Sequence, residues 1–294
     1  MGHARERNQR RTAMQKLSTE QKRAWEIDGY IHLEAVFDAE ETAFFRAQVD
    51  NLRGQPGWEP LRSPLGHYSW VEHSHDMDTE SFMDRRDLLP YDDAFIGLID
   101  RPGVFDLVVD LMGPYLAFSM SQAIVRPATP EFPGYTHTDG GEGMRRIRVT
   151  KTSRPLAMKV MYLLTDMTQP DCANLTVFPG SHMRPFREAD EPPVTPATPG
   201  AVALTGKAGD CILFPHSLWH GPGRNLSGRA RKSLLYNYCQ LFMRPYDYAT
   251  VSAVADRCTA RQQRLLGDLG YEFRPGSYTY VPEDQLELIL NPNA

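Results

Sequence analysis

The chain has 294 residues, 41% of them hydrophobic, and a formal net charge of −5, which is the balance of an ordinary folded protein in water. This charge gives no signal for binding nucleic acid or an anionic membrane. The four cysteines lie far apart and form no CxxC pair, so neither a disulfide framework nor a zinc ribbon is predicted.

Composition separates a short tail from the rest of the chain. Residues 1–16 are locally basic and predict a disordered, solvated tail, whereas 17–294 predict a single folded domain. The N-terminus lacks the apolar core of a secretory signal, and no later run approaches the roughly 18 apolar residues of a membrane span. We therefore expect a cytoplasmic protein.

Helices are predicted first along the chain. Ser18 and Gln21 have the spacing of a capping box, which begins a helix that Gly29 ends. A strand over 30–33 follows. Apolar residues at helical spacing predict two further helices, from Asp38 to Gly54 and from Asp92 to Leu111, the second interrupted near Pro102 and Gly103.

The stretch 55–89 is polar and rich in turn residues, and it is predicted to be an irregular lid or binding loop. His73, His75, Asp76 and Asp78 crowd together within it. They would suit a second metal site or a lid over the substrate, and the lack of any strand pattern around them favours the lid. We assign His73 to contact with the substrate.

After Gly113 the pattern changes to short β-prone runs separated by turn residues. Helices followed by many short strands predict an α+β, mainly β fold around a sandwich or barrel. The Pro-rich stretch 190–200 is predicted to be a surface loop, and a last helix is predicted over 260–269. The expected strands are Leu116–Val125, Ala157–Leu164, Leu175–Phe178, Ala201–Leu204, Cys211–Phe214 and Leu234–Leu241.

One constellation indicates metal chemistry. His137 and Asp139 are two residues apart on an extended segment, so their side chains point the same way and can bind one cation. With His220 from a later strand they supply two imidazoles and one carboxylate, the facial triad of non-haem Fe(II) oxygenases. The three positions left open suit a bidentate 2-oxo acid and dioxygen. A His-X-Asp pair alone is weak evidence in a chain with 9 histidines.

The segment after His220 supplies the supporting signal. An arginine on the following strand can hold the far carboxylate of a dicarboxylate cosubstrate, because its guanidinium is planar and bidentate. Arg229 and Arg231 both have a suitable position. The residues by themselves leave the choice between them open.

At this point the chain resembles the phytanoyl-CoA dioxygenase-like family of Fe(II)/2-oxoglutarate oxygenases. The likeness covers roughly 18–241, and several motifs in the right order are far more specific than any one of them. The matching residues are Trp25 to Tyr30, His137-Thr138-Asp139, Phe178-Pro179-Gly180-Ser181-His182, Gly209-Asp210 before Phe214-Pro215-His216, and His220 with Asn225, Ser227 and Arg231.

The resemblance implies a double-stranded β-helix, the jelly roll of cupin-like proteins, with flanking N-terminal and C-terminal helices. It implies that the predicted triad binds Fe(II), with 2-oxoglutarate and dioxygen as cosubstrates, and it selects Arg231 over Arg229 as the clamp on 2-oxoglutarate. By position, Gln122 and Lys159 are expected to contact the cosubstrate or the substrate. Because Asp139 is present in place of a small residue, hydroxylation-type chemistry is favoured over halogenation.

Further residues are assigned by their place beside the metal motifs. The run 140–148 is rich in glycine and arginine, so Arg146 is expected to meet an anionic or oxygen-rich substrate from a mobile segment. Trp219, next to the distal histidine, is predicted to wall the site. His182 and His216 are predicted to be structural, since Pro215 argues against a helix that would pair His216 with the distal ligand.

The sequence thus predicts a dioxygenase that hydroxylates a small-molecule metabolite, in specialised metabolism, with release of succinate and CO2. Desaturation, demethylation, epoxidation or ring closure are open to the same chemistry. Two alternatives are a non-catalytic metal- or sugar-binding jelly roll and a cupin-like metal-dependent hydrolase or isomerase. The hydrolase or isomerase would not need Arg231. No nucleic-acid or membrane partner is expected, and the sequence does not predict an oligomeric state.

Overall fold

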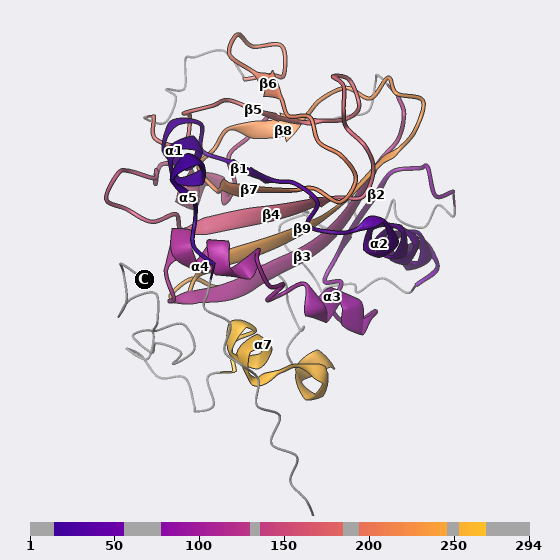
Figure 1. The fold of residues 1–294 in the computed structure, drawn as a ribbon, viewed down its shortest axis with the longest axis horizontal. Coiled ribbons are helices and arrows are strands. Elements are labelled where there is room, and N and C mark those ends of the chain that lie inside the picture. The colour runs from indigo at the N-terminus through magenta and orange to yellow at the C-terminus, as the bar shows by residue number, and fades with distance from the viewer. Residues whose placement is uncertain (1–14, 56–77, 130–135, 185–193, 246–252, 269–294) are drawn as a thin grey trace, which may run out of the picture.

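The computed structural model describes residues 15–55, 78–129, 136–184, 194–245 and 253–268 (Figure 1). Nine strands in these ranges form two antiparallel sheets, one of six strands in the order β1-β7-β4-β9-β3-β2 and one of three in the order β6-β5-β8. The strands are β1 (Ile31–Leu33), β2 (Met83–Arg86), β3 (Leu116–Arg126), β4 (Ala157–Leu163), β5 (Leu175–Val177), β6 (Val202–Ala203), β7 (Cys211–Pro215), β8 (His220–Pro222) and β9 (Arg231–Gln240). Two such sheets facing each other make the predicted jelly roll.

Three of the helices begin where the sequence predicts them. Ser18 and Asp38 each accept an N–H of the first turn in a complete capping box, and Thr259 does the same for the last helix. None of the helices in the described ranges is long and apolar enough to cross a membrane. They are α1 (Thr19–Ile27), α2 (Ala39–Asn51), α3 (Asp93–Gly97), α4 (Phe105–Met112), α5 (Gly141–Arg145) and α7 (Ala260–Leu265), with short 3-10 turns at Leu52–Gly54 and Ala255–Arg257.

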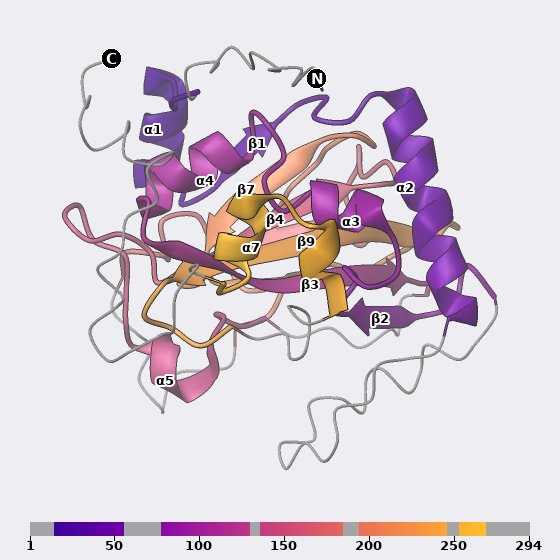
Figure 2. The same cartoon turned by 90° about the horizontal axis from the view of Figure 1, so that it is seen from below.

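The large sheet has two apolar faces. Helices α3, α4 and α7 lie on one side of it and the small sheet lies on the other (Figures 1 and 2). On β4 the side chains alternate between them: Val160 and Tyr162 pack toward the helices, whereas Met161 and Leu163 pack toward the small sheet. The side of the large sheet that faces the small sheet is called the inner face below, and the candidate functional side chains lie there.

Hydroxyl groups anchor the helical layer to the outer face of the large sheet. Tyr236 and Tyr238 of β9 are both fully buried, and their hydroxyls donate to the carbonyls of Phe95 and Ile99 at 2.7 and 2.8 Å. Buried tyrosines need such partners because an unpaired hydroxyl in an apolar core is costly. These bonds hold β9 in place from behind.

The stretch 55–89 differs from its prediction as a wholly irregular segment. Its residues Met83–Arg86 form β2, an edge strand paired with β3, and Arg85 is 1% exposed. The Arg85 guanidinium donates to the carbonyls of Leu52 and Gln55, so a polar sequence can lie in the sheet because its charges find partners. Residues 56–77, including His73, lie outside the described residues, and a lid there stays a prediction.

Other boundaries moved for local reasons. The run after Gly140, expected to be mobile, forms the short helix α5, which Gly140 enters with a φ of +84°. Strand β8 was not predicted because it is only three residues long and begins at His220. The last helix ends at Leu265 and not near residue 269.

Two glycines in the left-handed backbone region should differ in how much stability is lost when a methyl group is added. A Cβ on Gly209 (φ +98°) would lie 2.5 Å from the Phe37 carbonyl oxygen, whereas Gly200 (φ +92°) has nothing within 4 Å of that position. Gly200→Ala should lower the free energy of unfolding by about 1–2 kcal/mol through backbone strain alone. Gly209→Ala should cost roughly 1–3 kcal/mol more, because the β1 to α2 connection must shift. Urea unfolding measures both, and equal losses would contradict this account.

Candidate functional site

Backbone pairing brings the two predicted metal segments together. His137 and His220 form a β-bridge in which the N–H of each donates to the carbonyl of the other, at 2.8 and 2.9 Å. The Asp139 N–H donates to the His216 carbonyl at 2.8 Å, so the extended segment runs beside the chain that leads into β8. Residues two apart on an extended segment share a side, and His137 and Asp139 therefore both face the His220 side chain.

The three side chains converge on one carboxylate oxygen. Oδ1 of Asp139 lies 3.5 Å from Nε2 of His137 and 3.8 Å from Nε2 of His220, and the three ligand atoms lie within 4.8 Å of one another. A cation about 2.1 Å from each ligand atom needs separations of about 3 Å, which small side-chain rotations would supply. Within the described part of the chain, this is the one group of His, Cys, Asp and Glu with such geometry.

The His220 imidazole is prepared as a neutral ligand. Its Nδ1 lies 2.9 Å from the Leu218 carbonyl oxygen, which can only accept, so Nδ1 carries the proton and Nε2 keeps its lone pair. Burial lowers the pKa of His220 to about 3, although the Asp139 carboxylate acts in the opposite direction. The ring also packs against Phe214 with centroids 4.8 Å apart. These contacts set the direction in which Nε2 points.

Lys159 lies next to the metal-type group. Its Nζ is 2.6 Å from Oδ1 of Asp139. Burial would raise the pKa of Asp139, but the Lys159 ammonium and the two imidazoles outweigh it and hold that pKa well below its usual value. The carboxylate is therefore ionised, and a bound cation would share or take over the oxygen that Lys159 now contacts.

Arg231 is a buried cation on the same inner face. Its side chain is 5% exposed, with Nε donating to the Ala173 carbonyl at 3.1 Å and Nη1 to Oγ of Ser233 at 2.5 Å. Burial, together with the smaller effect of the charge of Arg126, its partner in the β3–β9 register, lowers the pKa of Arg231 to about 9. Among the described residues no carboxylate forms an ion pair with Arg231. A buried, uncompensated guanidinium is costly, and a site for an anion relieves that cost.

Gln122 presents an acceptor to the inner face. Its Nε2 donates to Oδ1 of Asp84 at 2.7 Å, and both residues are almost fully buried. Arg86 Nε lies 3.7 Å from the same oxygen. Because a carboxylate cannot donate, this contact fixes the orientation of the amide. Its Oε1 accepts no hydrogen bond from the described residues and is the acceptor that the side chain has left for a ligand, called its open atom below.

Two further histidines lie outside the metal-type group. His182 is buried against Gly29, where a Cβ would come within 2.3 Å of its Nδ1, and its carbonyl accepts a hydrogen bond from Ser217. His216 is held by its own ring nitrogens: Nε2 lies 2.9 Å from the Ile147 carbonyl oxygen. The position of His216 agrees with the structural role predicted for it. His182 is packed in the core, but neither of its ring nitrogens has a hydrogen-bond partner among the described residues, so the hydrogen-bonding role predicted for this side chain is not seen.

The arginines after the metal motif separate into two environments. Arg146 is exposed at the end of α5, whereas Arg148 is partly buried and donates to the carbonyls of Ser181 and Arg184. Arg148 therefore holds the Pro-Gly-Ser-His turn. Ser181 Oγ in turn accepts the Trp219 N–H at 2.9 Å, and the half-buried Trp219 is held next to His220.

Sequence reasoning did not single out Asp84 or Arg126. Asp84 sits in a polar edge strand that carries no alternation of apolar residues, so nothing local marked it. Arg126 ends a strand that was predicted, but its position opposite Arg231 depends on strand register. Register is a property of the sheet and not of either strand.

A jelly roll with two imidazoles, a carboxylate and a buried arginine on its inner face is the arrangement of the facial-triad class of non-haem iron proteins. The chain belongs to the phytanoyl-CoA dioxygenase (PhyH) family, whose model matches residues 25–233. That span includes both metal segments and Arg231.

Individual relatives are distant. An uncharacterized protein of Mycobacterium tuberculosis is 26% identical over 185 residues, which cover 61% of this chain and 65% of that protein's length. The ectoine dioxygenase of Sphingopyxis alaskensis is 26% identical over 250 residues, 75% of this chain and 76% of that protein. HygX from Streptomyces hygroscopicus, solved with nickel and 2-oxoglutarate, has a TM-score of 0.60 at 19% identity and covers 78% of this chain and 90% of its own. Another HygX structure also holds hygromycin B. These likenesses confirm the fold.

We expect the purified chain to bind one divalent cation through the three converging ligand atoms. His220→Ala should weaken that binding by well over tenfold, since loss of even an outer-shell partner costs about 10–100-fold. Titration calorimetry with Co(II) under argon measures it. His32→Gln is the matched control, because its imidazole contacts Asp210 away from the group. Retained affinity in His220→Ala would show that the metal binds elsewhere.

Proposed function

We propose that this chain is an Fe(II)- and 2-oxoglutarate-dependent oxygenase, with His137, Asp139 and His220 as the iron ligands. The observation that carries the proposal is Arg231, a buried cation that no carboxylate of the described ranges pairs with, on the face that holds the three ligands. When bound, Fe(II) and 2-oxoglutarate together activate dioxygen to oxidise an unreactive C–H bond, with release of succinate and CO2.

The protein's part in this reaction is to bind and orient the cosubstrate and to exclude water from the site. The Arg231 fork pairs with the remote carboxylate of 2-oxoglutarate, and the Ala173 carbonyl and the Ser233 hydroxyl hold that fork in place. Apolar side chains of the inner face, among them Met161 and Leu235, exclude water from the space between the sheets. His220 keeps its proton on Nδ1, so it need not lose a proton to bind iron.

The rival functions do not need the buried arginine. A metal-dependent hydrolase or isomerase, or a metal- or sugar-binding jelly roll, would use the three ligands alone. In those proteins an arginine at this position would be paired with a carboxylate or replaced, because an uncompensated buried charge destabilises the fold. Arg231 therefore favours the oxygenase.

The substrate we propose is a small molecule of specialised metabolism, hydroxylated at carbon. The ectoine dioxygenases and HygX support the size class, since the former are named for a small solute and the latter holds an antibiotic. Gln122 supports a substrate that carries a hydroxyl or N–H group, because its open atom is an acceptor and would repel the carboxylates of the cosubstrate. Trp219 and Arg146 are proposed to border the same substrate.

Two broader assignments also stay proposals. Residues 17–294 act as one domain, and the protein works in the cytoplasm. Substrate contact by His73 rests on the sequence alone.

The first test is the visible charge-transfer band that forms when 2-oxoglutarate chelates Fe(II), followed anaerobically. Wild-type protein should develop the band, and Arg231→Met should raise the Kd for 2-oxoglutarate about 30-fold or more, since losing one partner of a buried charge pair costs about 2–5 kcal/mol. Co(II) affinity should stay within about twofold of wild type in this variant. Wild-type protein that binds iron but never develops the band would favour a hydrolase or a non-catalytic jelly roll.

The variant Gln122→Leu tests whether this side chain contacts the substrate or the cosubstrate. The change keeps the size and removes the open acceptor together with the Nε2 donor to Asp84, which keeps its contact with Arg86. The Kd for 2-oxoglutarate should therefore stay within about twofold of wild type. By contrast, kcat/KM for a substrate found by succinate release should fall about tenfold, the cost of one neutral hydrogen bond. A tenfold rise in the Kd for 2-oxoglutarate would assign Gln122 to the cosubstrate.

A further inference from the structure

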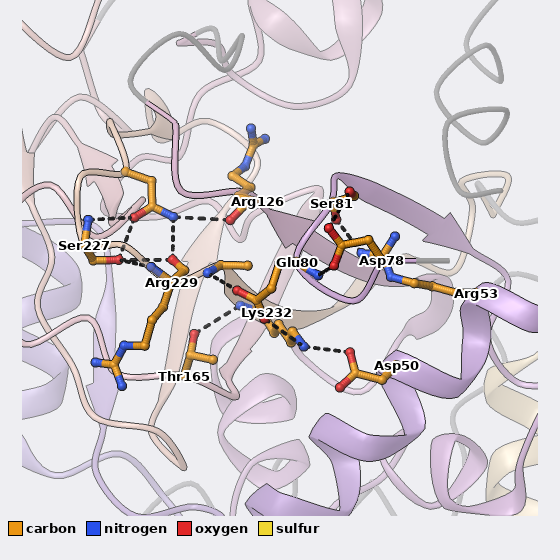
Figure 3. A network of polar contacts seen from close by, with 12 residues as sticks. Asp50, Arg53, Asp78, Glu80, Ser81, Arg126, Thr165, Ser227, Arg229 and Lys232 are labelled. Atoms are coloured by element: carbon orange, nitrogen blue, oxygen red, sulfur yellow. Dashed lines mark hydrogen bonds and ion pairs between the residues drawn. The ribbon is translucent and has the colours of Figure 1, made fainter. Parts of the chain in front are cut away.

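A polar network surrounds the first residues of β9 (Figure 3). Lys232 follows Arg231 and its side chain lies on the other side of the strand, where it is 6% exposed and its Nζ is 2.7 Å from Oδ1 of Asp50 on α2. Its main-chain N–H donates to Oγ1 of Thr165 at 3.0 Å. The residue after the proposed clamp is therefore anchored to a helix and to a neighbouring loop.

Glu80 anchors the residue before the clamp. One of its carboxylate oxygens, Oε2, accepts the N–H of Ala230 at 2.7 Å, and the other, Oε1, lies 3.7 Å from Nζ of Lys232 (Figure 3). Glu80 is distant in sequence, and its side chain is 55% exposed. A single carboxylate thus contacts both neighbours of Arg231 in the chain.

The network acts where positive charge is concentrated. Arg126 and Arg231 lie directly opposite each other in the β3–β9 register, and Lys232 adds a third cation one residue further. Like charges opposite each other on paired strands repel, so this end of the ladder tends to open. Asn225 resists that opening, because its Nδ2 donates to the carbonyls of Arg126 and Arg229 at 3.2 and 2.9 Å. Asp50 and Glu80 compensate the charge of Lys232, on the other side of the strand from the two arginines.

We propose that Glu80 is a positioning residue for the dicarboxylate cosubstrate, acting on Arg231 through the main chain of Ala230 and the side chain of Lys232. The inference rests on the proposed function. By holding Ala230 and Lys232, Glu80 keeps the Arg231 fork aimed into the inner face before 2-oxoglutarate arrives, so less ordering is needed on binding. Without it, the main chain at Ala230 loses an anchor, and the fork of the next residue is held less firmly.

The test compares Glu80→Ala with Glu80→Gln, using the anaerobic Fe(II) band to measure the Kd for 2-oxoglutarate. Glu80→Ala should raise that Kd about 3–10-fold, the equivalent of one lost hydrogen bond. Glu80→Gln retains an acceptor for the Ala230 N–H and should recover most of the affinity. Asp93→Asn is the matched control, because that exposed carboxylate pairs with Arg257 in the helical layer.

A double-mutant cycle distinguishes positioning from general loosening of the fold. In an Arg231→Met background, Glu80→Ala should have no further effect on 2-oxoglutarate binding, and it should not change Co(II) affinity in either background. An unchanged Kd in Glu80→Ala, or an equal loss with and without Arg231, would overturn the inference. Both measurements require that the wild-type protein develops the charge-transfer band with Fe(II) and 2-oxoglutarate. If it does not, the proposed function fails, and this outcome is distinct from failure of the inference about Glu80. Because Glu80 is exposed, these variants avoid the folding risk of replacing Lys232.

Discussion

The reciprocal backbone pairing of His137 with His220 is the constraint on which the site depends. It joins a segment that follows β3 to the start of β8, two parts of the chain more than eighty residues apart, and it aligns their side chains toward one point. The Asp139 N–H bond to His216 extends the same pairing, and the Arg148 contacts secure the turn beside it. A metal group built on main-chain hydrogen bonds is precise because strands and bridges move little.

Uncompensated charge explains the rest of the inner face. Arg231 is buried with only neutral acceptors among the described residues, and Lys159 pairs with the ionised carboxylate of Asp139. Without bound ligands the inner face thus contains an excess of positive charge at the Arg231 end and an ionised ligand group beside Lys159. A chelated cation and a dicarboxylate would complement both regions. The folded chain carries that electrostatic cost as the condition for selecting such ligands.

Prediction from the sequence succeeded where the signal was local. The capping boxes at Ser18 and Asp38 are made by residues three positions apart, and the long strands β3, β4 and β9 are rich in β-prone residues, although β9 begins at Arg231 and not at the predicted Leu234. It failed at β2, where charged residues interrupt the run, and at β8, which is too short to show a pattern. Asp84 and Arg85 lie in the sheet only because partners from distant segments satisfy them.

The sequence by itself indicated an α+β fold around a sandwich or barrel and, through the resemblance, the family and its jelly roll, which the structure and the family match confirm. The two metal motifs and the choice of Arg231 were also predicted from the sequence, and they stay proposals. Tertiary structure alone decided which atoms meet. That Lys159 contacts Asp139, that Asp84 orients Gln122, and that Glu80 reaches Ala230 all follow from strand register and from the packing of α2 and the segment after it. Register and long-range packing are set by the whole hydrophobic core, and no local spacing in the chain encodes them.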